Sequence, residues 1–325
     1  MADMIFREAI AQGLREAIEE DDNVLLMGED IGAYDGAYAV TRGFLEKYGP
    51  RRVRDTPISE SGFVGAAVGA ALAGLKPIVE IMTINFSLLA MDQIINHAAK
   101  LPYMSNGQFK VPMIIRTVTG GGAQLAATHS QSFEGWYASV PGLKVAVPST
   151  PYDALGLLRT ARKDVNPIIF AEHALLYGSR GDVPTEYYDV PFGKANVTRF
   201  GQDITLVAYG RMAHIATQAA DLLAERGKEA EVIDLRTLRP LDMDTVVESV
   251  RKTSRAVVVE ETWKTGGFAG EIASSIQEQA FDYLDGPVVR VGGADVPTPY
   301  NGTLEAATIP NAERVLQSIE KQLGL

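Results

Sequence analysis

The sequence predicts an α/β fold of two domains, each built on a parallel sheet, and two observations lead to this prediction. Short apolar runs of strand type, such as VLLMG and KPIVEIM, alternate along the chain with segments of helical period. This alternation is typical of βαβ units, whose parallel sheet is covered by helices on both faces. The chain also has 325 residues, which is more than most single domains contain. We therefore expect two α/β domains in succession.

The first domain is expected to cover residues 1–185. Its strands are VLLMG, KPIVEIM, VPMIIRTV, LKVAVP and NPIIFAE, and helices are expected over residues 87–100 and 151–161. The passage 181–201 is rich in Pro, Gly and aromatic residues without a helical period, which is typical of a linker, and residues 186–200 within it are expected to join the two domains.

The second domain is expected to cover residues 201–325. DITLVAYG, EAEVIDL and RAVVVEE are its strands, and helices are expected over residues 212–226 and 242–252. The final segment, NAERVLQSIEKQLGL, has a helical period that places Leu316, Ile319 and Leu323 on one face.

The composition excludes several classes of protein. Apolar residues make up 46% and charged residues 22%, so the chain can bury substantial cores. The formal net charge of −11 argues against nucleic acid or an anionic membrane as a partner. Cysteine is absent, which excludes disulfides and thiolate metal sites. With no signal-peptide or transit-peptide pattern and no apolar stretch of membrane-spanning length, the sequence predicts a cytoplasmic protein.

The segment DTPISESGFVGAAVGAALAGLKPIVE, residues 55–80, is the most informative part of the chain. Pro57 favours an extended Thr56, and Ser59 is a good N-cap for a helix that begins near Glu60. Small residues recur at helical spacing in that helix, so it can lie close to another backbone. Taken alone, the pattern favours a carboxylate that completes a helix N-terminus near the surface.

Several long motifs give the segment a further meaning. They are DTPISE at 55–60, GEDIGAYDGAY at 28–38, MTINFSLLAMDQIIN at 82–96, HSQSFEGWYASVPGLKV at 129–145, DLRTLRPLD at 234–242, VVEETWKTGG at 258–267 and PTPYNG at 297–302. In this order they resemble the β chain of the thiamine-diphosphate-dependent decarboxylase component of 2-oxo acid dehydrogenase complexes, most closely the pyruvate dehydrogenase β subunits. The resemblance implies a transketolase-like pyrimidine-binding domain followed by a transketolase C-terminal-type domain.

The resemblance also implies an activity, the oxidative decarboxylation of pyruvate with transfer of the acetyl group to a lipoyl domain. Glu60 matches the glutamate that bonds N1′ of the cofactor's aminopyrimidine and favours the tautomer that removes the thiazolium C2 proton. Phe86 matches the aromatic that packs on the aminopyrimidine, for which ordinary core packing is the alternative. Ile58, together with Ile81 or Met82, is expected in the apolar wall around the carboxylate of Glu60.

His129 follows the glycine-rich GGGAQLAAT and begins HSQ. Glycines let the backbone approach a ligand closely, and histidine exchanges protons near neutral pH. By resemblance, His129 lines the active-site channel near the substrate and the incoming lipoyl group. The alternative is a histidine that anchors its loop through a buried hydrogen bond.

The turn TARKDVNP is a candidate cation site. In some members of the family the equivalent turn holds a structural potassium ion. The matching positions here are Ala161, Arg162, Asp164 and Asn166, with Met113 from a neighbouring strand, and Ala161, Asp164 and Asn166 are the candidate ligands. Oxygen ligands suit a hard cation. An ordinary Asp/Asn turn is the alternative.

The chain lacks the Gly-Asp-Gly triplet with which thiamine enzymes hold the Mg²⁺ of the diphosphate. We therefore expect a partner α chain to hold Mg²⁺ and the diphosphate, in a heterotetramer of two α and two β chains. By resemblance, the second domain presents an acidic surface near the chain terminus to the subunit-binding domain of the dihydrolipoyl acyltransferase. The rival hypotheses are the β subunit of a branched-chain 2-oxo acid or acetoin dehydrogenase and, from another class, a non-catalytic scaffold subunit.

Overall fold

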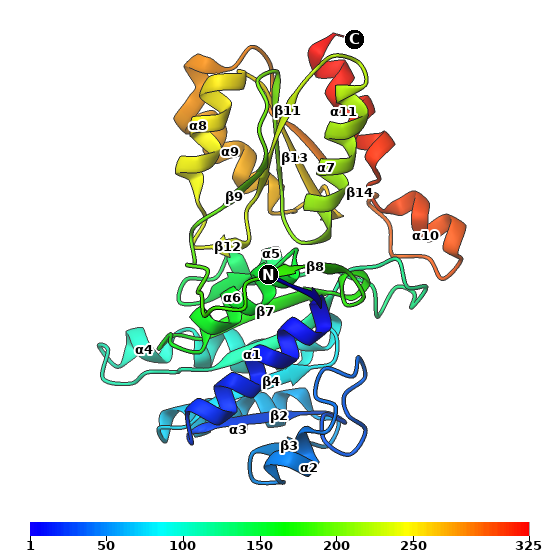
Figure 1. Ribbon diagram of the computed structural model, residues 1–325. Coiled ribbons are helices and arrows are strands. Elements are labelled where there is room, and N and C mark those ends of the chain that lie inside the picture. The colour runs from blue at the N-terminus through cyan, green and yellow to red at the C-terminus, as the bar shows by residue number, and fades with distance from the viewer. Residues whose placement is uncertain (325) are drawn as a thin grey trace. The chain divides into compact units, whose positions relative to one another are not determined.

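The computed structural model describes residues 1–324 and divides into two compact units. The first unit comprises Met1–Thr119 and Trp136–Phe192, and the second comprises Gly120–Gly135 and Gly193–Leu325. Each unit contains a mainly parallel sheet with helices on both faces, so the predicted fold class is confirmed (Figure 1). The segment 120–135 packs with the second unit although it lies within the first predicted domain.

The elements of the first unit alternate as the sequence predicts. They are β1 (Ala2–Ile5), α1 (Phe6–Glu20), β2 (Val24–Gly28), α2 (Phe44–Tyr48), β3 (Val53–Asp55), α3 (Glu60–Leu72), β4 (Lys76–Ile81), the 3₁₀ helix η1 (Ile84–Ala90), the π-helix η2 (Gln93–Ala98), α4 (Leu101–Met104), β5 (Ile114–Thr119), α5 (Glu134–Ala138), β6 (Lys144–Ala146), α6 (Pro151–Ala161), β7 (Ile168–His173), the 3₁₀ helix η3 (Ala174–Leu176) and β8 (Arg180–Val183).

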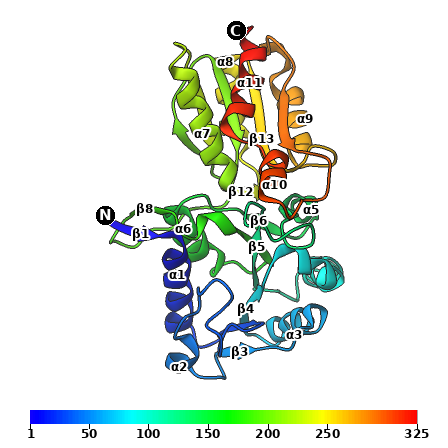
Figure 2. The same cartoon turned by 90° about the vertical axis from the view of Figure 1, so that its right-hand side faces the viewer.

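Within this unit the strand order is β6-β7-β5-β4-β2-β3, and all neighbouring pairs are parallel. Helices α1 and α6 pack together on one face of the sheet, and α3 lies on the other (Figure 2). Phe6, Ile10 and Leu14 recur along α1 at helical spacing and are fully buried in the core. Because β2 and β4 are parallel neighbours, their carboxyl ends lie side by side at the end of the sheet where parallel sheets place their functional groups.

A buried ion network crosses three neighbouring strands of this sheet. Arg116 on β5 donates to Glu80 on β4 at 2.6 Å and, through two nitrogens, to Glu172 on β7 at 2.7 and 2.8 Å. The hydroxyl of Tyr177 donates to Glu172 at 2.7 Å. Burial by itself lowers the pKa of Arg116, but the two carboxylates hold that pKa above its ordinary value. All three ionised side chains depend on one another, because removing one partner would leave an uncompensated buried charge.

The helix predicted over residues 87–100 is not a regular α-helix. Residues 84–90 form the 3₁₀ helix η1 and residues 93–98 form the π-helix η2, which continues with a bond from the amide of Ala99 to the carbonyl of Ile94. A Cβ at Gly142 would lie 2.2 Å from the carbonyl oxygen of Ala99, so glycine permits this close approach of two backbones. The π-helix thus ends where the chain lies close to the backbone of Gly142.

The second unit contains the remaining elements. They are β9 (Asn196–Arg199), β10 (Ile204–Ala208), α7 (Arg211–Ala224), β11 (Ala230–Asp234), β12 (Thr237–Arg239), α8 (Met243–Thr253), β13 (Ala256–Trp263), α9 (Ala269–Ala280), the 3₁₀ helix η4 (Phe281–Tyr283), β14 (Val289–Gly293), α10 (Gly302–Thr308) and α11 (Ala312–Leu323). Residues 196–199, which lie in the stretch expected to be a linker, thus form a strand.

The sheet of the second unit has the order β14-β13-β10-β11-β9, in which only β9 is antiparallel to its neighbour. Helices α7 and α11 pack on one face, and α8 and α9 pack on the other (Figure 1). The predicted C-terminal helix is confirmed as α11, whose Leu316 and Ile319 are buried in the core.

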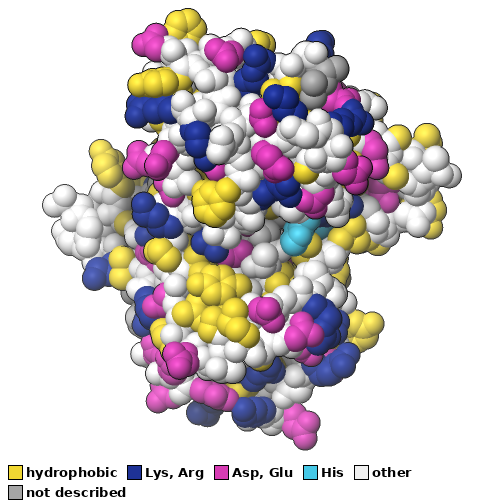
Figure 3. Space-filling view, turned by 45° about the horizontal axis from the view of Figure 1, so that its top comes forward, with side chains coloured by type: hydrophobic (Ala, Val, Ile, Leu, Met, Phe, Trp, Pro, Cys, Tyr) yellow, Lys and Arg dark blue, Asp and Glu magenta, His cyan; other side chains and the backbone are white. Residues whose placement is uncertain are grey.

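The surface is mixed in charge, with acidic and basic side chains interspersed over the face in view in Figure 3. Among residues 1–324, no helix is long and apolar enough to cross a membrane.

Candidate functional site

The loop that follows β2 brings a buried carboxylate to the edge of the first sheet. Glu29 is 6% exposed, and its Oε1 has no hydrogen-bond partner within the described residues. Burial, the charge of Glu60 and the charge of Asp30, in that order, raise the pKa of Glu29 to about 7. The motif GED therefore supplies a carboxyl group that takes up or releases a proton near neutral pH.

Asp55, the first residue of DTPISE, fixes the same loop through its backbone amides. Its carboxylate accepts hydrogen bonds from the amides of Gly32 at 2.6 Å and Ala33 at 2.9 Å. The next residue is tied to the loop as well, since the amide of Thr56 donates to the carbonyl of Gly28 at 2.9 Å. These bonds link the two motifs and set the direction in which the chain enters α3.

Glu60 is the first residue of α3 and is only 4% exposed, so the predicted helix start is confirmed. Ser59 occupies the N-cap as expected, but its side chain makes no capping hydrogen bond. Within residues 1–324, no donor hydrogen-bonds the carboxylate of Glu60, which interacts electrostatically with Glu29. The buried Oε1 of Glu29, which has no partner among the described residues, is costly unless a ligand or partner supplies a donor.

The other predicted cofactor residues lie in the same unit as Glu60 but do not enclose it. Met82 follows β4, and Phe86 lies on η1, which packs against α3; both are half-buried. Ile58 is 85% exposed, so this chain alone does not close the expected apolar wall.

Exposed apolar side chains follow one another along the segments after β4, from η1 to the loop after α4. Residues of η1, α4 and the loop after it contribute Leu88, Leu89, Tyr103, Met104 and Phe109. Large exposed apolar side chains that gather on consecutive segments are typical of a surface that another chain covers.

His129 lies in the second unit, on the loop between Gly120 and Ser130, and is exposed. Its Nδ1 lies 2.9 Å from the hydroxyl oxygen of Thr128. The loop begins with left-handed glycines, Gly120 at φ +90° and Gly122 at φ +95°, a conformation that side chains disfavour. The exposure of His129 disfavours the alternative of a buried anchoring histidine.

Two carboxylates from distant parts of the second unit hold this loop. Glu261 accepts from the amide of Gly121 at 2.6 Å, and Glu305 accepts from the amides of Gly122 at 2.9 Å and Gln124 at 3.0 Å. Sequence reasoning missed both residues. In the sequence, Glu261 lies within the motif VVEETWKTGG and Glu305 lies three residues after PTPYNG, and these motifs are the signal that could have pointed to them.

The motif VVEETWKTGG also folds around a second buried acid. Glu260 on β13 is fully buried and accepts from the amide of Ala269 at 3.0 Å and the hydroxyl of Tyr209 at 3.3 Å. A Cβ at Gly267 would lie 2.0 Å from its Oε1, which explains why glycine stands there. Burial raises the pKa of Glu260 to about 7, against the opposite effect of the bond from Ala269.

In the turn proposed for potassium, the carboxylate of Asp164 already has partners from the chain itself. Asp164 forms an ion pair with Lys144 and accepts from the amide and side chain of Asn166, both at 2.9 Å. The ammonium group neutralises the charge that potassium would neutralise. Within residues 1–324, no group of three or more His, Asp or Glu side chains is arranged to hold a metal ion.

Comparison with protein families gives two matches that together span most of the chain. The family model described as the transketolase pyrimidine-binding domain matches residues 2–179. The model described as the transketolase C-terminal domain matches residues 193–315.

Named proteins with similar sequences align with almost all of the chain. The pyruvate dehydrogenase E1 component subunit beta-2 of rice mitochondria is 49% identical over 98% of this chain and 86% of its own length. The corresponding β subunit of Rickettsia felis is 48% identical over 97% of both chains. Among solved structures, a split gene transketolase described as an inactive β4 tetramer has a TM-score of 0.80 and 25% identity, with 99% of both chains covered.

Proposed function

The chain belongs to the family of pyruvate dehydrogenase E1 component β subunits, built from transketolase-type pyrimidine-binding and C-terminal domains, and on that premise we propose that it works in the oxidative decarboxylation of pyruvate. In this role the acetyl group passes to a lipoyl domain of the dihydrolipoyl acyltransferase. Thiamine diphosphate is the cofactor that the family implies. When bound, it supplies the carbanion chemistry that the decarboxylation of a 2-oxo acid requires.

The observation that carries the proposal is the buried pair Glu60 and Glu29. Glu60 is the first residue of α3 and is 4% exposed, and no described residue donates a hydrogen bond to its carboxylate, which leaves that carboxylate available to a ligand with a protonated ring nitrogen. Glu60 would hold the proton at N1′ of the aminopyrimidine. The raised pKa of Glu29 supports this role. Burial and the negative charge of Glu60 disfavour a second negative charge on Glu29, so a proton stays beside Glu60 near neutral pH.

Phe86 and Met82 would contact the aminopyrimidine from the side of η1 and β4. Both side chains are half-buried, which leaves part of each accessible to a ligand. A flat heterocycle on Phe86 would gain offset stacking of about 1 kcal/mol. Ile58 would join the wall only when its exposed side chain is covered by a second chain.

A partner α chain would supply the other half of the cofactor site. Two observations support this part of the proposal: the chain has no Gly-Asp-Gly triplet for the Mg²⁺ of the diphosphate, and apolar side chains from η1 to the loop after α4 are exposed. The solved neighbour is described as a tetramer, which agrees with an oligomeric enzyme. We propose two α and two β chains, with each cofactor held between an α and a β chain.

His129 would lie in the channel through which substrate and the lipoyl group reach the cofactor. Its exposure and the anchoring of its loop by Glu261 and Glu305 support a side chain that is held in place yet accessible.

A structural potassium ion near Ala161, Asp164 and Asn166 stays a prediction, and it would require Asp164 to exchange its ion pair with Lys144 for the metal.

The rival hypotheses are less well supported. The names of the similar proteins favour pyruvate over branched-chain 2-oxo acids or acetoin as the substrate. A scaffold without chemistry has no need of a buried carboxylate such as Glu29, whose Oε1 has no partner among the described residues and which therefore costs free energy of folding.

Calorimetry tests the proposal directly. The purified chain alone should bind thiamine diphosphate and Mg²⁺ weakly and should turn over no pyruvate, because it holds only the pyrimidine half of the site. Adding the cognate α chain should restore both binding and turnover. Tight cofactor binding by this chain alone would contradict the divided site.

A further inference from the structure

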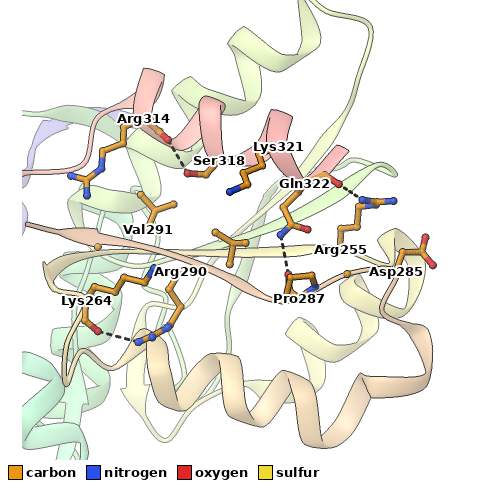
Figure 4. Close-up of a pocket in the computed structure, with 13 residues that line it drawn as sticks. Arg255, Lys264, Asp285, Pro287, Arg290, Val291, Arg314, Ser318, Lys321 and Gln322 are labelled. Carbon is orange, nitrogen blue, oxygen red and sulfur yellow. Dashed lines mark hydrogen bonds between the residues drawn. The ribbon is translucent and has the colours of Figure 1, made fainter. Parts of the chain in front are cut away.

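A cationic groove lies on the second unit, beside the edge strand β14 and under α11 (Figure 4). Its volume is about 640 Å³, within the range of small-molecule sites. The ionisable side chains that line it are Arg255, Lys264, Arg290, Arg314 and Lys321, against one carboxylate, Asp285. A chain with a net charge of −11 thus concentrates positive charge in one hollow.

The cations converge from separate elements. Arg314, Ser318 and Lys321 follow one another on α11 at intervals of four and three residues, so they share one face of the helix, and Figure 4 shows them along it. Arg290 lies on β14, while Arg255 and Lys264 flank β13. Elements that are far apart in the sequence therefore supply the positive charges of one groove.

Within the described residues, none of the five cations forms an ion pair with a carboxylate. Other cations of the same unit do, such as Lys228 with Asp203 at 2.9 Å. The groove arginines are oriented by backbone carbonyls instead: Arg255 donates to the carbonyl of Gln322, and Arg290 to that of Lys264 at 3.0 Å. A carbonyl fixes a guanidinium without neutralising it, so the charge stays available to a ligand.

The groove is also built firmly and lacks aromatic lining. The side chain of Gln322 donates to the carbonyl of Pro287 at 3.0 Å and ties α11 to the segment before β14. Val289 and Val291 provide the apolar part of the lining, and no aromatic side chain belongs to it, so a nucleobase would find nothing to stack on. Charge without stacking favours a compact anion over a nucleotide base.

We propose that this groove binds a small anion that carries at least two phosphate groups, such as inorganic pyrophosphate or an organic diphosphate. Arginine forks match phosphate oxygens in pairs, and two phosphates can engage the cations of α11 and of the β13–β14 region together. The expected acidic surface near the chain terminus stays a prediction, and it would have to lie away from this positively charged lining.

Calorimetric titration of inorganic pyrophosphate into the purified chain, with inorganic phosphate as a second arm, tests the proposal. Pyrophosphate should bind more tightly than phosphate, and its affinity should fall as salt rises. Lys321→Gln should weaken pyrophosphate binding about fivefold, as expected for one partly exposed charge pair. Arg314→Gln should weaken it at least as much.

Lys228→Gln is the matched control, since it removes the same charge from the same unit outside the groove. It should leave pyrophosphate affinity unchanged. Equal weakening by Lys228→Gln and Lys321→Gln, or no pyrophosphate binding at millimolar concentration, would overturn the proposal. An oligo-glutamate peptide that binds through Lys321 when pyrophosphate does not would overturn it in favour of an acidic peptide site along β14.

Discussion

Replacing Glu305 by Gln should loosen the loop that carries His129 without unfolding the second unit. The carboxylate of Glu305 accepts from the amides of Gly122 at 2.9 Å and Gln124 at 3.0 Å. A glutamine side chain keeps one acceptor oxygen and turns an NH₂ group toward the other amide, so one charge-assisted bond is lost. The loss amounts to about 2 kcal/mol, which raises the local opening equilibrium about 30-fold.

Hydrogen exchange measured by mass spectrometry on a peptide covering residues 120–130 provides the assay. The amides of Gly122 and Gln124 should exchange about 30-fold faster in Glu305→Gln than in the wild type, while peptides of α7 keep their rates. Glu313→Gln is the matched control, because Glu313 is exposed in the same unit and loses the same charge. Unchanged exchange in Glu305→Gln, or equal acceleration in Glu313→Gln, would refute the anchoring role.

Three other perturbations have expected outcomes. Arg116→Met leaves Glu80 and Glu172 buried without their partner, so urea unfolding of the chain should show a loss of about 3–5 kcal/mol, and an unchanged midpoint would contradict the network. The pKa of Glu260 in the folded chain is raised to about 7, so the folded chain binds a proton at this group more tightly than the unfolded chain does. The resulting stabilisation is fully present at a pH below the ordinary pKa of a glutamate and is lost as the pH rises through 7. From about pH 5.5 to about 8.5 the wild type should lose about 2 kcal/mol relative to Glu260→Gln, and parallel pH profiles would refute the assignment. His129→Ala should slow reductive acetylation of a lipoyl domain about tenfold or more while sparing assembly with the α chain, whereas failed assembly would favour a structural role.

Local patterns in the sequence predicted the elements well where local interactions decide the conformation. Residues 151–161 form a helix with the predicted bounds, and α3 begins at Glu60 after Ser59 as expected. The π-helix η2 was missed, and at its end the chain makes a long-range contact, between Gly142 and the carbonyl of Ala99. Such a contact leaves no periodic pattern in the sequence.

The parts of the candidate site that were missed depend on long-range contacts. The anchors of the His129 loop lie 140 residues from Gly121 in the case of Glu261 and 183 residues from Gly122 in the case of Glu305. Arg116 and Glu172 are 56 residues apart, and a strand pattern does not reveal which inward-facing charges will pair. Glu29 directly follows the predicted strand VLLMG, but its protonation near neutral pH depends on burial and on Glu60, which the local sequence does not reveal.

The most direct test is pyruvate decarboxylation by the Glu60→Gln variant assembled with its α chain, measured with an artificial electron acceptor. Because an amide cannot share the N1′ proton as a carboxylate does, turnover should fall about 100-fold or more. Thermal stability and assembly should be kept, and the exposed-site control Glu46→Gln should retain full activity. Near-wild-type turnover by the assembled Glu60→Gln enzyme would contradict the assignment of Glu60 as the residue that holds the cofactor's proton.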